Sequence, residues 1–103
     1  MNVRNITAPH DWFDVLVNGE TLQAAVMDLE PGGGESGSKG NEHAGSEQLL
    51  FVLDGEVEAE IGDETRTLRA GDVVIVPRGA PHRFTNAGDR PARTLNAYSP
   101  PAY

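Results

Sequence analysis

A strict alternation of side chains along residues 56–61 restricts the possible folds more than any other segment of the chain. Three glutamates occupy every second position, and Val, Ala and Ile stand between them. Successive side chains of a strand point to opposite faces, so the segment predicts a strand with one buried and one solvated face. The preceding Asp54-Gly55 pair is a strong hairpin signal that links this strand to the apolar run at 47–53.

Further strands are indicated along most of the chain. Twelve glycines and seven prolines divide it every eight to twelve residues, a spacing typical of all-β domains. The additional predicted strands are 12–17, 21–29, 65–68, 73–76, 82–85 and 92–98. The run Val73–Val76 is wholly apolar, which predicts a strand buried in a closed barrel or sandwich. The sequence therefore predicts an all-β fold.

Size and composition exclude several classes of protein. A chain of 103 residues forms one domain with one core, taken here as 1–103. The absence of cysteine excludes disulfides and thiolate sites. No apolar run is long enough to span a membrane, and residues 1–9 lack a signal-peptide core, so we expect a cytoplasmic protein without a membrane partner. The net charge of -8 argues against nucleic-acid binding, which needs a basic stripe.

The second half of the chain contains a spaced pattern of five residues. Five residues separate Gly71 from Pro77, two separate Gly79 from His82, and three separate His82 from Asn86. Proline ends a strand where no further ladder donor is needed, and glycine permits a positive φ in the following turn. This pattern resembles the second conserved motif of the cupin superfamily at every defining position.

The first motif of that superfamily is matched less completely. Six residues separate Gln48 from Gly55, His43 lies five places before Gln48, and Asn41 stands where a first histidine is common. The resemblance implies that Asn41, His43, Gln48 and His82 are the metal ligands. The donors are uncharged, and Asn41 departs from the family pattern, so the site is expected to bind metal less tightly than the family norm.

The resemblance covers about residues 24–101 and implies a specific architecture and cofactor. The expected fold is a single cupin barrel, a jelly roll or double-stranded β-helix, with its core at about 21–100. The expected cofactor is a divalent transition metal, namely Fe, Mn, Zn or Ni. The expected ligand is a small oxygenated or acidic molecule in the barrel mouth.

Strand alternation extends the predicted site beyond the metal ligands. Leu50 and Val52 share the face of the first-motif glutamine, and Phe84 shares the face of the second-motif histidine. Arg83 is open to two interpretations, a solvated rim charge or a fork that captures a substrate carboxylate. The glycine-rich segment 31–45 is likewise either a flexible surface loop or a loop that supplies the site. His10, which stands alone, is interpreted as a surface histidine.

Three functions remain open at this point. The chain is a metal-dependent enzyme of the dioxygenase, isomerase or lyase type, a non-catalytic module that binds or senses a small molecule, or a metal-free protein kept as a dimer. Fold alone does not decide among them. A homodimer is expected because a small barrel leaves sheet edges and apolar faces that need cover. The N-terminal residues Trp12, Phe13, Val15 and Val17 are its predicted interface, or they cap the monomer's own core.

Overall fold

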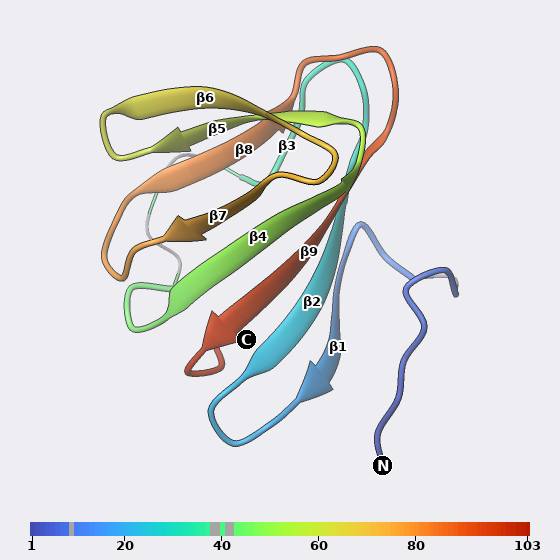
Figure 1. Cartoon of the computed structure of the whole chain (residues 1–103), viewed down its shortest axis with the longest axis vertical. Helices are drawn as coiled ribbons and strands as arrows, with labels where there is room; N and C mark the ends of the chain where they lie inside the picture. Colours follow the sequence, from blue (N-terminus) through green and yellow to red (C-terminus); the bar gives the residue numbers. More distant parts are fainter. Residues whose placement is uncertain (9, 38–39, 41–42) are drawn as a thin grey trace.

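The computed structural model describes residues 1–8, 10–37, 40 and 43–103. Its strands are β1 (Phe13–Asn18), β2 (Gln23–Leu29), β3 (Gly34–Glu35), β4 (Glu47–Asp54), β5 (Glu56–Ile61), β6 (Glu64–Arg69), β7 (Val73–Val76), β8 (His82–Asn86) and β9 (Ala92–Ser99). They form two antiparallel sheets, one ordered β1-β2-β9-β4-β7 and the other β3-β8-β5-β6 (Figure 1). The all-β fold predicted from the sequence is confirmed. Within the described part of the chain, no helix is long and apolar enough to cross a membrane.

The hairpin between β4 and β5 shows how the sequence builds this fold locally. Gly55 has a φ of 78°, a conformation that residues with side chains rarely adopt. A Cβ atom at this position would lie 2.6 Å from the carbonyl oxygen of Pro91. Along β5 the predicted alternation is observed, with Val57 and Ala59 buried, Glu56 and Glu58 exposed, and Glu60 half-buried.

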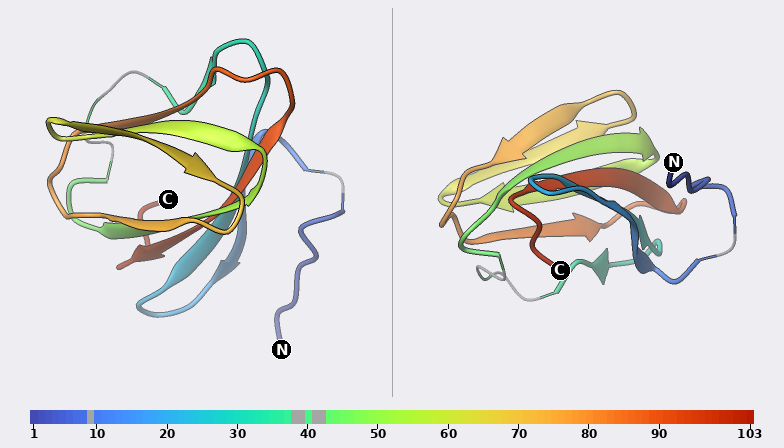
Figure 2. Two further views of the ribbon diagram at one scale, coloured as in Figure 1. Left: turned by 45° about the horizontal axis from the view of Figure 1, so that its top comes forward. Right: turned by 90° about the horizontal axis from the view of Figure 1, so that it is seen from below.

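The two sheets stack face to face and enclose one apolar core (Figure 2). Inward-facing side chains from both sheets interdigitate there, as expected for packed antiparallel sheets. The largest cluster of buried side chains comprises Met27, Leu29, Leu50, Val52, Val57, Ala59, Leu68, Val76, Phe84 and Ala92. The sheet that contains β1 begins at Phe13, so strand structure starts earlier than the predicted barrel core of 21–100.

One prediction about burial is wrong. The run 73–76 does form a strand, but Val73 and Ile75 are 56% and 49% exposed. The reason is that alternate side chains of β7 point to opposite faces of its sheet, so Val76 is buried while Val73 and Ile75 lie on the outer face. Leu49 and Leu53 on the neighbouring β4 are 36% and 37% exposed. We call Leu49, Leu53, Val73 and Ile75 the outer apolar patch.

Candidate functional site

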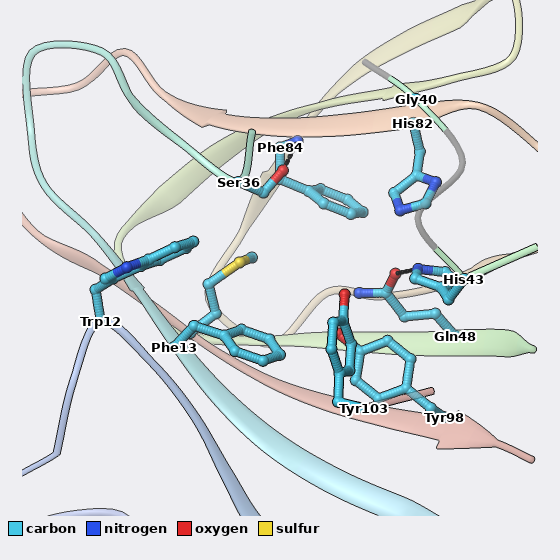
Figure 3. Close-up of a pocket in the computed structure, with 11 residues that line it drawn as sticks. Trp12, Phe13, Ser36, Gly40, His43, Gln48, His82, Phe84, Tyr98 and Tyr103 are labelled. Atoms are coloured by element: carbon cyan, nitrogen blue, oxygen red, sulfur yellow. Dashed lines mark hydrogen bonds between the residues drawn. The ribbon is translucent and has the colours of Figure 1, made fainter. Parts of the chain in front are cut away.

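Three of the four predicted metal ligands meet at the mouth of the barrel. The rings of His43 and His82 face each other with centroids 4.6 Å apart. His43 Nε2 donates a hydrogen bond to Gln48 Oε1 at 2.8 Å, and the ring of His82 lies on the opposite side of the cavity mouth from Gln48 (Figure 3). Asn41, the fourth predicted ligand, lies outside the described residues.

The turn that contains Pro77 and Gly79 places His82. Gly79 has a φ of 85°, and the amide of Ala80 donates to the carbonyl of Pro77 at 3.1 Å. This turn leaves the Ala80 carbonyl 2.9 Å from His82 Nδ1, which must donate because a carbonyl only accepts. The Nε2 atom of the neutral His82 ring therefore carries a lone pair.

His43 lies in the turn that leads into β4. Ser46 N donates to the carbonyl of His43 at 2.9 Å, which closes that turn. The His43 side chain is buried, and its ring packs against that of Tyr98 in a T-shaped arrangement with centroids 5.1 Å apart. Its Nδ1 atom is also buried and has no hydrogen-bond partner among the described residues.

These groups form the polar end of a cavity of about 190 Å³. Aromatic and apolar side chains from both sheets make the walls (Figure 3). The lining residues are Trp12, Phe13, Met27, Ser36, Gly40, His43, Gln48, His82, Phe84, Tyr98 and Tyr103. An apolar cavity of about 150 Å³ is enough for benzene, so this one suits a molecule of about one ring. Ser36, Gly40 and His43 show that the glycine-rich segment does contribute to the cavity.

The predicted substrate-binding residues separate into two groups. Phe84 lines the cavity as expected. Leu50 and Val52 are fully buried in the core and do not contribute to the lining. Arg83 also lies outside the lining, and its Nε donates to Glu60 Oε2 at 2.7 Å. Strand alternation predicts which face a side chain takes but not how deep in the barrel it lies.

Aromatic residues near both ends of the described chain line the cavity, and local sequence patterns did not predict this. Phe13 packs against Trp12 and Tyr103, with ring centroids 5.9 and 4.9 Å away. The fully buried Gln23 holds residues 102–103, because its Oε1 accepts from the amides of both at 3.1 and 3.0 Å. No local pattern marks these aromatic residues, since only the fold brings them to the mouth.

The interpretation of His10 as a surface histidine is wrong. Its side chain is only 5% exposed. Its Nε2 lies 2.8 Å from Asp28 Oδ2, and its Nδ1 lies 2.7 Å from the Ala8 carbonyl. Asp28 also receives the Arg93 guanidinium, and its amide donates to the carbonyl of Trp12 at 2.7 Å. This cluster therefore anchors the segment that brings Trp12 to the cavity.

The His10 cluster predicts a specific pH dependence of stability. Hydrogen bonds to the Ala8 carbonyl and Asp28 raise the pKa of His10 above 6.5. Burial opposes ionisation of Asp28, but hydrogen bonds from Arg93 and His10 outweigh it and lower the pKa below 3.8. The stabilisation is therefore complete between these two values. It is lost as pH rises through the raised pKa of His10 or falls through the lowered pKa of Asp28.

We expect His10→Gln to lower the melting temperature most near pH 5. The expected loss is about 1 kcal/mol, discounted for solvent at the one-third-exposed Asp28. The loss should shrink towards pH 8.5, where His10 is neutral and can donate to only one of its two acceptors. Thermal denaturation of both proteins across this range measures the difference. A difference that does not vary with pH would show that protonated His10 is not the stabilising form.

Comparisons with known proteins give a consistent result. A family model described as "Cupin domain" matches residues 25–98. The chain is 34% identical over 91 residues to auxin-binding protein ABP19b of Prunus persica, covering 84% of this chain and 42% of that protein. The chain spans about two fifths of the length of the first curated relatives that it matches.

Solved structures agree in fold. A protein from Bacillus halodurans superposes with a TM-score of 0.86 at 23% identity, covering 98% of this chain and 82% of that one. The cupin domain of Schizosaccharomyces pombe Cnp3 superposes with a TM-score of 0.75 at 26% identity, covering 86% and 60%. The first of these likenesses shows the fold alone.

Proposed function

The chain belongs to the cupin family, and from that membership we propose that its barrel mouth binds a small organic molecule beside a divalent transition metal. The observation that carries the proposal is the meeting of His43, His82 and Gln48 at the polar end of an otherwise aromatic cavity. Ligand sites typically combine apolar walls with a few convergent polar groups.

The donor set fits a transition metal of modest affinity. Two imidazoles and an amide oxygen are suitable ligands for Fe, Mn, Zn or Ni, because imidazole binds all of these ions. His43 Nε2 and Gln48 Oε1 lie 2.8 Å apart, so both atoms could contact one ion once the hydrogen of the neutral ring has moved from Nε2 to Nδ1. That move leaves a buried Nδ1–H without an acceptor among the described residues, which also weakens binding. The described residues contain no group of three His, Cys, Asp or Glu side chains that could hold an ion. Without a carboxylate, binding should be weaker than at a charged site.

The remaining cavity residues would bind and orient the organic molecule. A metal held there would supply Lewis-acid polarisation of an oxygen on that molecule. Phe13, Phe84 and Tyr103 offer ring faces and edges on which one planar group can pack. The aromatic walls also limit water at the polar end. The Arg83 guanidinium pairs with Glu60 and is therefore not expected to bind the organic molecule. An acidic group of that molecule would bind at the polar end of the cavity.

One observation favours a non-catalytic binding or sensing module as the second candidate. No Asp or Glu side chain lines the cavity within the described part of the chain. A carboxylate general base is therefore lacking there, and proton transfer would fall to His43 or His82. The Prunus persica relative is named an auxin-binding protein, which agrees with small-molecule binding. Turnover of a bound molecule would favour the metal-dependent enzyme. Saturable binding without turnover would favour the non-catalytic binding module.

Fluorescence of Trp12, the single tryptophan, tests the proposal because its side chain lines the cavity. Protein purified without a histidine tag is first assayed for metal by elemental analysis. It is then titrated with Zn²⁺, Mn²⁺ or Ni²⁺, followed by single-ring carboxylates, phenols and sugar acids. We expect saturable metal binding at one site per chain and a fluorescence change with at least one class of organic molecule. The absence of both would reject the proposal.

A further inference from the structure

A row of buried polar side chains runs from the cavity into the wall of the barrel. Gln48 Nε2 donates to Asn96 Oδ1 at 2.8 Å. Asn96 Nδ2 donates to Thr94 Oγ1 at 3.0 Å, and the Thr94 hydroxyl donates to the carbonyl of Met27 at 3.3 Å. Gln48 is 3% exposed, and Asn96 and Thr94 are fully buried. We call Gln48, Asn96 and Thr94 the polar row.

The inner end of the polar row determines the direction of every hydrogen bond in it. A carbonyl oxygen can only accept, so the Thr94 hydroxyl donates to Met27 and its oxygen is left to accept from Asn96. The Asn96 amide oxygen then accepts from Gln48 Nε2. The Gln48 amide oxygen consequently points into the cavity and accepts from His43.

The outer end of the row agrees with this direction. His43 Nε2 donates to Gln48 Oε1, so the neutral ring carries its hydrogen on Nε2 and a lone pair on Nδ1. The buried Nδ1 has no partner among the described residues. In the reversed row Nδ1 would carry the hydrogen, and a buried donor would lack an acceptor. Buried donors without acceptors are rare in proteins.

We propose that Asn96 and Thr94 are positioning residues of the site. They hold the Gln48 amide with its oxygen towards the cavity and, in the protein without metal, keep neutral His43 in the tautomer protonated on Nε2. The inference deepens the proposed function. It rests on that function in one respect only, namely that His43 and Gln48 are ligand-binding residues. With the amide reversed, the cavity would present an NH₂ group, which donates hydrogen bonds and cannot ligate a cation.

The tautomer of His43 tests the proposal directly and needs no bound ligand. Long-range ¹H–¹⁵N correlation spectra of labelled protein at pH 8 distinguish the two neutral forms. We expect the Nε2–H form in the unmodified protein. Thr94→Val keeps the side-chain shape but removes the hydroxyl, and Asn96→Leu removes the acceptor. Both variants should shift His43 towards the Nδ1–H form, whereas Thr94→Ser should preserve the original tautomer.

A matched control separates positioning from general destabilisation. Asn86 is a buried asparagine on β8 that donates to the carbonyls of Leu29 and Arg90, outside the polar row. Asn86→Leu should lower the melting temperature without changing the His43 tautomer. The Nδ1–H form in the unmodified protein, or the Nε2–H form in both Thr94→Val and Asn96→Leu, would overturn the proposal. If Asn96→Leu does not fold, the near-isosteric Thr94→Val decides.

Zn²⁺ affinity provides a second readout. Loss of a residue that orients a metal ligand typically weakens binding about 10- to 100-fold. We expect the Zn²⁺ dissociation constant, measured by competition with a chelator, to rise on this scale in Asn96→Leu and to stay unchanged in Asn86→Leu. Equal effects in the two variants would contradict positioning by Asn96. If the unmodified protein binds none of the metal ions and organic molecules tested, the proposed function fails, and the tautomer result still decides the role of the polar row.

Discussion

Replacing His82 with alanine is expected to abolish the rise in melting temperature that Zn²⁺ gives the unmodified protein. A ligand that binds only the folded state stabilises it by about 2.7 kcal/mol at 100 times its dissociation constant. For a domain of this size that corresponds to roughly 10–20 °C. His82 supplies one of the two imidazoles at the polar end of the cavity. The variant would retain one imidazole and one amide oxygen, too few donors for measurable affinity at the same Zn²⁺ concentration.

Leu50→Ala is the matched control for this experiment. Leu50 lies two residues after Gln48 on the same face of β4 but is fully buried in the core. Its truncation should lower the free energy of unfolding by about 2–5 kcal/mol while the shift with Zn²⁺ remains. Differential scanning calorimetry with and without Zn²⁺ measures both effects. A full shift in His82→Ala would remove His82 from the ligand set.

We propose that the protein is a homodimer, and Ile75→Glu is expected to reduce its mass in solution to that of the monomer. The outer apolar patch of Leu49, Leu53, Val73 and Ile75 lies on adjacent strands, with Leu49 opposite Ile75 in the register. Contiguous exposed apolar side chains of this kind mark interaction surfaces. A symmetric pairing would place this patch against its own copy, where a glutamate would bury two like charges.

This interface differs from the N-terminal one predicted from the sequence. Phe13 lines the cavity, which agrees with the alternative that it covers the monomer's own core. Light scattering at micromolar concentration should therefore give a dimer for the unmodified protein and for Trp12→Ala. Leu22→Glu is the charge-matched control, since Leu22 is 54% exposed outside the outer apolar patch. A dimer that survives Ile75→Glu but not Trp12→Ala would return the interface to the N-terminal strand.

Local sequence patterns were sufficient for the strands and their connections. The alternation along β5 and the turn at Gly55 depend on backbone geometry within a few residues, so they are readable without the fold. The same holds for the turn at Gly79 that presents His82. The resemblance of the two spaced motifs to those of the cupin superfamily implied that His43, Gln48 and His82 would meet.

The alternation of side chains along a strand was insufficient to predict how deep in the barrel a side chain lies or which distant residue it contacts. It assigned Leu50 and Val52 to the inward face correctly, yet both lie in the core below the cavity. It also left the direction of Arg83 open, and the structure pairs that residue with Glu60. The exposure of Val73 and Ile75 depended on which face of the sheet lies against the core, which the sequence of a wholly apolar strand does not indicate.

Alternation and turn residues in the sequence indicated the strands and their connections, because both act over a few residues. The cupin barrel and the three side chains at its mouth were implied by the resemblance to the two family motifs. What surrounds those side chains depends on the folded structure. The fold brought Trp12, Phe13 and Tyr103 to the cavity from opposite ends of the chain. It also aligned the polar row behind Gln48, since hydrogen bonds between residues 48 and 96 exist only once β4 and β9 have paired.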